Sequence, residues 1–314
     1  MNMIFAGTSD FASPSLEALI ASPQHDVLAV ITQPDKPRGR GREMQITPIK
    51  EIALAHSIPV LQPEKISAPE SIAEIKEFGQ IGAFVVVAYG QKIPKELLEW
   101  PQCGVINVHG SILPKYRGAA PIQYALIMGE QQTGVTTMLM DEGWDTGDML
   151  LQESLEIDPN ENAEELSIRL SAIGAKLLIR TLDGVADGTI NPIPQDNDLA
   201  TMVRSLARDA GAVDWSLAAN DIVNLIRGCT PRPGAFTKLN GSTIKIWRAQ
   251  VDSFDEVNGQ AGEIVAVGKE GIVVAAGNGS VRIVDLQPES KQRMPAADFA
   301  RGGKVSVGDK FDVR

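Results

Sequence analysis

Residues 104–114 of this 314-residue chain read Gly-Val-Ile-Asn-Val-His-Gly-Ser-Ile-Leu-Pro. The apolar start predicts a β-strand, and the glycine and proline that follow predict its end, because both residues break regular strand pairing. Side chains two apart on a strand lie on the same face, so Asn107 and His109 are expected to project together. An amide and an imidazole would then sit at the carboxyl end of a strand, which is where ligands bind in open α/β sheets.

The chain before this strand alternates short apolar runs with helical segments. Residues 3–6 and 26–32 read as strands on either side of a helix over 13–20, a β-α-β opening that predicts a parallel sheet. The run at 83–88, Ala-Phe-Val-Val-Val-Ala, is typical of a central strand covered on both faces. The turn after the first strand lacks a G-x-G-x-x-G fingerprint, so we expect an α/β, Rossmann-like sheet that binds no dinucleotide.

The chain is long enough for two domains. Residues 190–207 contain several prolines and aspartates without an apolar period, which is typical of a linker. The part from 208 onward has a helix near 218–227 and then short strands separated by turn signals such as Asn278-Gly279. We therefore predict a catalytic domain over 1–189 and a small C-terminal β-barrel, of the oligonucleotide-binding type, over 208–314.

The net charge of −11 is unevenly distributed. Residues 206–314 carry 14 Lys/Arg against 13 Asp/Glu, whereas residues 1–205 carry 15 against 27. A broad basic surface for nucleic acid is therefore disfavoured, while a local basic patch is still allowed.

The cysteines and histidines exclude several kinds of site. Cys103 and Cys229 are far apart in sequence and are expected to be buried thiols in a reducing compartment. No two of the three histidines have the spacing of metal ligands. The chain has no signal-peptide pattern at its start and no run of 18 apolar residues, so neither secretion nor a membrane span is expected.

Residues 33–48 form a basic segment rich in glycine and proline. Its basic side chains are spaced by two along the chain: Lys36, Arg38, Arg40 and Arg42. Such a segment cannot bury a core, so it is expected to be a mobile loop. The loop is either simply solvated or contacts phosphate groups, to which guanidinium groups on a pliable backbone are suited.

A second polar loop, Asp-Glu-Gly-Trp-Asp-Thr-Gly-Asp at 141–148, follows a predicted strand over 134–140. It adds the carboxylate of Asp145 to the amide of Asn107 and the imidazole of His109. No serine lies in a G-x-S-x-G elbow, and a glycosidase would need two acids and no histidine. A hydrogen-bond donor, an imidazole and a carboxylate are instead suited to attack on a carbonyl by an external nucleophile.

Three motifs together resemble the family of 10-formyltetrahydrofolate-dependent formyltransferases. They are Asn-Val-His-Gly-Ser-Ile-Leu-Pro at 107–114, Arg-Gly-Ala-Ala-Pro at 117–121 and the loop at 141–148. Gly110 and Ile112 stand where alanine and leucine are common, and neither exchange removes a functional group. Nearly the whole chain, including the basic segment and the C-terminal barrel, is similar to the branch of the family that acts on methionyl-tRNA.

This resemblance implies a reaction in which a formyl group passes from 10-formyltetrahydrofolate to an amine without a metal. Asn107 and His109 would donate hydrogen bonds to the formyl oxygen as it becomes an oxyanion. Asp145 would orient His109, stabilise its cationic form and help to take the proton of the attacking amine.

The resemblance also assigns binding residues and partners. Folate contacts would be made by Ser111, Ile112, Leu113, Pro114, Gly90 and Gln91. Contacts to transfer RNA would be made by Lys36, Arg38, Arg40 and Arg42, with Arg42 the first choice for reading a base. The expected acceptor is initiator methionyl-tRNA, and the expected enzyme is a cytoplasmic monomer.

Three other functions are compatible with parts of the sequence. A related formyltransferase could act on a sugar nucleotide or on glycinamide ribonucleotide, although a small acceptor would not require the barrel and the arginine-rich loop. A hydrolase could release formate from the same folate, with water in place of the amine. A non-enzymatic RNA-binding module would make the grouping of Asn107, His109 and Asp145 a coincidence.

Overall fold

The computed structural model describes the chain except for residues 39–42, 256 and 313–314. It divides into two compact units. The first comprises residues 1–118, 134–155 and 167–202, and the second comprises 119–133, 156–166 and 203–314. Two segments that precede residue 189, 119–133 and 156–166, are thus grouped with the C-terminal part, which a division at 189 and 208 does not include; those two boundaries stay a prediction.

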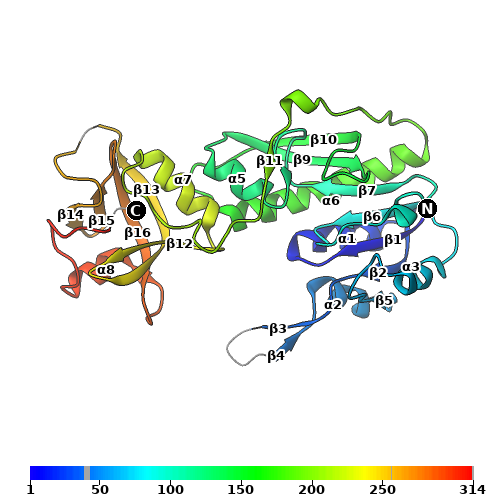
Figure 1. Ribbon diagram of the computed structural model, residues 1–314, viewed down its shortest axis with the longest axis horizontal. Helices are drawn as coiled ribbons and strands as arrows, with labels where there is room; N and C mark the ends of the chain where they lie inside the picture. The colour runs from blue at the N-terminus through cyan, green and yellow to red at the C-terminus, as the bar shows by residue number, and fades with distance from the viewer. Residues whose placement is uncertain (39–42, 256, 313–314) are drawn as a thin grey trace. The chain divides into compact units, whose positions relative to one another are not determined.

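The first unit is built on a seven-stranded sheet with the order β10-β9-β7-β6-β1-β2-β5. The strands are β1 (Asn2–Gly7), β2 (Asp26–Ile31), β5 (Val60–Leu61), β6 (Ala83–Val87), β7 (Val105–His109), β9 (Gln132–Leu139) and β10 (Met149–Glu156). From β5 to β7 the pairing is parallel, as predicted, whereas β9 runs antiparallel to β7. β1 has β2 on one side and β6 on the other (Figure 1). The connections therefore change direction at β1, the kind of switch point at which α/β sheets bind ligands.

Helices connect these strands, and one helix, α6, follows the last of them. They are η1 (Asp10–Ala12), α1 (Ser13–Ala21), α2 (Pro48–Ala55), α3 (Pro69–Lys76), α4 (Lys95–Leu98) and α6 (Ala163–Ala186). The Thr47 side chain accepts a hydrogen bond from the Lys50 N–H, and Pro48 follows at the first helical position, so these two residues fix the start of α2. At the start of α6, Asn162 and Glu165 each accept a hydrogen bond from the other's N–H, a reciprocal cap.

The basic segment is more regular than predicted. β3 (Lys36–Arg38) and β4 (Glu43–Gln45) form an antiparallel pair in which Pro37 lies opposite Met44. A ladder of two strands has only edge strands, so it tolerates a proline that lacks an N–H donor. Arg40 and Arg42 lie outside the described residues, as does the tip between the two strands.

The second unit is built on an antiparallel sheet with the order β12-β13-β16-β15-β14, and β17 pairs with β16. Its elements are α5 (Pro121–Ile127), α7 (Ala219–Cys229), β12 (Ala235–Leu239), β13 (Ser242–Ser253), β14 (Ile264–Gly268), β15 (Gly271–Ala275), β16 (Ser280–Pro288), β17 (Met294–Pro295) and α8 (Ala296–Arg301). The hairpin predicted around Asn278-Gly279 is confirmed by the pairing of β15 with β16. Trp215 stacks on Phe311 with ring centroids 5.5 Å apart in its core, and the sheet is consistent with a small barrel.

Short elements lie where the chain passes between the two units: β8 (Arg117–Gly118), η2 (Asn197–Leu199) and β11 (Met202–Val203). Within the described residues, no helix is both long enough and apolar enough to cross a bilayer.

Candidate active site

Asn107 and His109 lie at the carboxyl end of β7, between β6 and β9. Their alternation along the strand puts both side chains on one face, and only 8% and 6% of their surfaces are exposed. Among the residues that the structure describes, the Asn107 side-chain amide has no hydrogen-bond partner, and its polar atoms are not fully enclosed. This amide is therefore free to bind a ligand.

His109 is fixed by a backbone group. Its Nε2 lies 3.0 Å from the carbonyl oxygen of Tyr116. A carbonyl oxygen only accepts, so Nε2 carries a proton and donates it. The other ring nitrogen, Nδ1, faces Asp145 Oδ2 at 3.7 Å, which is beyond a direct hydrogen bond. Nδ1 is thus the ring atom that remains available for proton exchange.

Asp145 is held from two sides. Its Oδ2 accepts a 2.8 Å hydrogen bond from the Gly118 N–H, and its carbonyl oxygen accepts one of 2.8 Å from the Gln195 side chain. The residue has a φ of +54°, in the left-handed region that costs energy for a residue other than glycine. Backbone strain of this kind persists only where neighbouring contacts enforce it, and it is common at functional sites.

The loop that carries Asp145 is closed by its own side chains. Both carboxylate oxygens of Asp141 accept from the Thr146 hydroxyl, at 2.7 and 2.8 Å, and Oδ1 also accepts from the Gly143 N–H. The Leu139 N–H donates to the Asp148 carbonyl oxygen at the base of the loop. The structure thus brings together the three residues predicted to be catalytic, with Tyr116 as the closer partner of the imidazole.

Several polar groups of the turn after β7 are already engaged in hydrogen bonds within the protein. Ser111 is fully buried and donates to the Lys115 carbonyl oxygen at 2.6 Å. The Leu113 N–H donates to the Thr136 hydroxyl, which donates in turn to the Ser111 carbonyl oxygen. Of the four residues expected here to contact folate, only Ile112 and Pro114 are partly exposed.

Gly90 and Gln91 follow β6, the strand beside β7. Gly90 is exposed and has a φ of +88°, which suits glycine. The Gln91 side chain accepts from the Ile66 N–H at 2.8 Å and donates to two carbonyl oxygens of the preceding loop. Gln91 therefore supports a neighbouring loop with its side chain and would offer a ligand mainly backbone groups.

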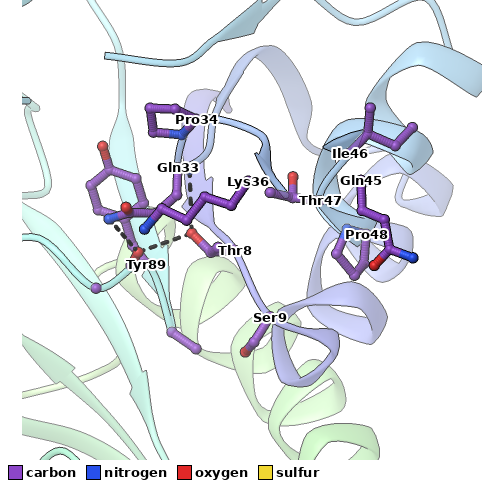
Figure 2. Close-up of a pocket in the computed structure, with 12 residues that line it drawn as sticks. Thr8, Ser9, Gln33, Pro34, Lys36, Gln45, Ile46, Thr47, Pro48 and Tyr89 are labelled. Carbon is purple, nitrogen blue, oxygen red and sulfur yellow. Dashed lines mark hydrogen bonds between the residues drawn. The ribbon is translucent and has the colours of Figure 1, made fainter. Parts of the chain in front are cut away.

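A cavity of about 430 Å³ lies at the carboxyl ends of β1, β2 and β6 (Figure 2). Its wall combines Thr8, Gln33 and Tyr89 from the strand ends with Lys36 and Gln45 from the β3–β4 pair. The Thr8 hydroxyl and the Gln33 amide both donate to the Tyr89 carbonyl oxygen, at 2.9 and 3.3 Å, which ties the three strand ends together. The cavity therefore lies at the switch point of the sheet, and one of its strands, β6, is the neighbour of β7, which carries Asn107 and His109.

Of the basic residues predicted to contact RNA, the structure places two. Lys36 lines this cavity, and Arg38 pairs through its backbone with Glu43. Arg40 and Arg42 lie outside the described residues.

The sequence did not indicate three features of the site. The carbonyl of Tyr116, the N–H of Gly118 and the side chain of Gln195 all contact the catalytic residues or their loop. Gly118 lies in the Arg-Gly-Ala-Ala-Pro motif, which could have drawn attention to it, but Gln195 lies in a segment without any pattern. No group of three His, Cys, Asp or Glu suited to a metal ion occurs in the described part of the chain.

Known proteins are similar to this chain over nearly its whole length. Residues 1–182 match the family model described as Formyl transferase, and residues 205–304 match the one described as Formyl transferase, C-terminal domain. A Geobacter metallireducens protein named methionyl-tRNA formyltransferase is 48% identical, over 98% of this chain and 97% of its own. One of the same name from Agathobacter rectalis is 46% identical over the whole of both chains.

Solved structures share the fold at low identity. An N-formyltransferase from Helicobacter canadensis, in complex with folinic acid and dTDP-3-aminofucose, is 19% identical with a TM-score of 0.66, over 91% of this chain and 98% of its own. HypX from Aquifex aeolicus, in complex with tetrahydrofolic acid, is 16% identical with a TM-score of 0.65, over 100% of this chain and 50% of its own. On the two family models and the full-length relatives, the chain belongs to the formyltransferase family.

Proposed function

We propose that this enzyme transfers the formyl group of 10-formyltetrahydrofolate to the α-amino group of methionyl-tRNA. The observation that carries the proposal is the grouping of three side chains: a free amide and an oriented imidazole on β7, and the carboxylate that the loop after β9 brings beside them. Relatives of that name, 44–48% identical over nearly the full chain, support it.

The three side chains divide the chemistry between them. The folate supplies the formyl carbon that the amine attacks. Asn107 donates a hydrogen bond to the formyl oxygen as negative charge develops there. With Nε2 engaged by Tyr116, His109 donates from Nδ1 to the same oxygen when the ring is in the cationic form that the Asp145 carboxylate stabilises. Asp145 accepts the proton released by the amine, directly or through water, and returns it to the leaving nitrogen.

The residues around the site fit a folate donor. Gly90 and Gln91 present backbone groups beside the end of β7, and Ile112 and Pro114 offer partly exposed apolar surface for a flat ring. Ser111 and Leu113, both buried, shape this surface by fixing the turn and do not need to touch the ligand with their side chains.

We also propose which methionyl-tRNA is the acceptor and which residues bind it. We assign initiator methionyl-tRNA, engaged by Lys36, Arg38, Arg40 and Arg42, with Arg42 reading a base. A local basic arm suits a polyanion that the acidic first part of the chain would otherwise repel. The cavity that Lys36 lines is large enough for a nucleoside, and it lies at the same edge of the sheet as the carboxyl end of β7, which carries His109.

We further propose that the enzyme acts as a monomer in the cytoplasm. One unit of a single chain supplies all three catalytic side chains, so the site requires no second copy. The cytoplasm is where aminoacylated transfer RNA is used in translation.

Two alternatives remain to be tested against this assignment. Sugar N-formyltransferases share the fold over 91–93% of this chain, so the C-terminal domain does not by itself exclude a small acceptor. They are only 19% identical to it, however, compared with 44–48% for the relatives named methionyl-tRNA formyltransferase. Hydrolysis of the folate is the second alternative.

The experiment offers one donor and several acceptors. The purified enzyme is given 10-formyltetrahydrofolate with initiator methionyl-tRNA, elongator methionyl-tRNA, a dTDP-amino sugar or water alone. We expect rapid formylation of the initiator species, weaker formylation of the elongator species and no turnover with the other two. Equal use of both RNAs would remove the initiator assignment. Formylation of the sugar, or formate release without RNA, would replace the proposed function.

A further inference from the structure

The segment over 193–201, which the sequence places in a linker, contacts both loops of the active site. Gln195 Nε2 donates to the carbonyl oxygens of Asp145 and Gly147, at 2.8 and 2.7 Å. Six residues later, the Thr201 hydroxyl accepts from the Tyr116 N–H at 2.7 Å. One short stretch of chain thus holds the loop that carries Asp145 and the loop whose carbonyl orients His109.

The orientation of the Gln195 amide is determined by its partners. Its Oε1 accepts a 2.9 Å hydrogen bond from Nε of Arg117, which is only 5% exposed. A guanidinium group only donates and the two backbone carbonyls only accept, so a flipped amide would lose all three hydrogen bonds. The Gln195 side chain is therefore fixed at both ends by groups of the same unit.

The hydrogen bonds of Gln195 hold the part of the loop whose backbone is strained. Asp145 has a φ of +54°, and the Gln195 side chain donates to the carbonyl oxygens of Asp145 and Gly147. The Asp145 carboxylate itself accepts a hydrogen bond from the N–H of Gly118, the residue that follows Arg117. Loss of the Gln195 contacts would let the backbone relax from the left-handed region and move the carboxylate relative to His109 Nδ1.

We propose that Gln195 is a positioning residue for formyl transfer, which holds the Asp145 carboxylate beside the imidazole of His109. This inference rests on the proposed function. The residue touches neither substrate in this account, and it acts only through the loop at 141–148.

Two variants separate positioning from general stability. Gln195→Ala removes all three hydrogen bonds, whereas Gln195→Glu removes the two donors and keeps an acceptor for Arg117. Gln131→Glu is the matched control, because the Gln131 amide donates to a single carbonyl oxygen, that of Gly129, away from the catalytic loop. For both Gln195 variants we expect kcat to fall on the order of 10- to 100-fold, with the KM of folate and of methionyl-tRNA changed by no more than about twofold.

A double-mutant cycle tests the route of the effect. In an Asp145→Ala background, Gln195→Ala should cause no further loss in single-turnover rate, because the group that it positions is gone. An equal additional loss in that background would overturn the proposal. So would unchanged kcat in both Gln195 variants, or a loss explained by raised KM alone.

Amide hydrogen exchange tests the contact without any substrate. Peptides that cover 141–149 should exchange faster in Gln195→Ala and Gln195→Glu than in the wild type, and at the wild-type rate in Gln131→Glu. Unchanged exchange in both Gln195 variants would overturn the proposal. An inactive wild type would instead overturn the proposed function, and the exchange measurement then decides separately whether Gln195 fixes the loop.

Discussion

The Nε2 atom of His109 donates to the backbone oxygen of Tyr116, 3.0 Å away. This hydrogen bond sets the ring orientation and assigns a proton to Nε2, which leaves Nδ1 for the reaction. The sequence resemblance gives the orienting role to Asp145. In the structure, Asp145 Oδ2 lies 3.7 Å from Nδ1 and is itself held by Gly118, so the two residues are positioned separately and meet at the reacting centre.

The free amide of Asn107 should act mainly in the transition state. We expect Asn107→Ala to lower kcat on the order of 100-fold while folate affinity changes little, because the hydrogen bond strengthens as the oxyanion forms. Single-turnover kinetics and a separate folate-binding titration measure the two quantities. A large loss of folate affinity with an unchanged chemical step would assign Asn107 to ground-state binding.

Lys36 should contribute to RNA binding through charge. We expect Lys36→Ala to lower kcat/KM for methionyl-tRNA and to reduce the slope of log kcat/KM against log salt by about 1, with folate KM unchanged. Lys76→Ala, which removes an exposed lysine at the end of α3, is the control and should change neither quantity. Identical salt slopes for Lys36→Ala and the wild type would show that Lys36 makes no phosphate contact.

Gly147 allows a close approach in the catalytic loop. A Cβ at this position would lie 1.9 Å from the Leu139 carbonyl oxygen, so Gly147→Ala should destabilise the protein by about 1–3 kcal/mol and lower activity. Gly268→Ala is the matched control, because a Cβ there meets nothing within 4 Å. Thermal unfolding of both variants checks this, and equal melting temperatures would show that the loop shifts without cost.

Elements with local signals in the sequence could be predicted, whereas contacts between distant segments could not. The first strand was expected at 3–6 and spans Asn2–Gly7, and the helix expected at 13–20 spans Ser13–Ala21, because apolar period and proline position are local signals. The antiparallel direction of β9 was not foreseen, since an apolar run does not encode direction. Gln195 was missed because its role depends on partners 48 to 78 residues away in the chain.

His25 should make stability depend on pH. It is 8% exposed, and burial lowers its pKa from 6.5, with the N-terminal ammonium adding to this effect and Asp183 opposing it. The unfolded chain therefore binds a proton more readily than the folded one, so stability is present above pH 6.5 and is lost as the pH falls below it. The melting temperature should fall more steeply from pH 7 to pH 5.5 in the wild type than in His25→Gln. Parallel curves would contradict the assignment.

The most direct test of the catalytic assignment is the single-turnover rate of formyl transfer to methionyl-tRNA in His109→Ala and Asp145→Ala. Neither side chain belongs to an apolar core, so both variants should fold. We predict that each loses transfer by a factor on the order of 100 or more. A folded variant of either kind that transfers formyl at nearly the wild-type rate would contradict the account.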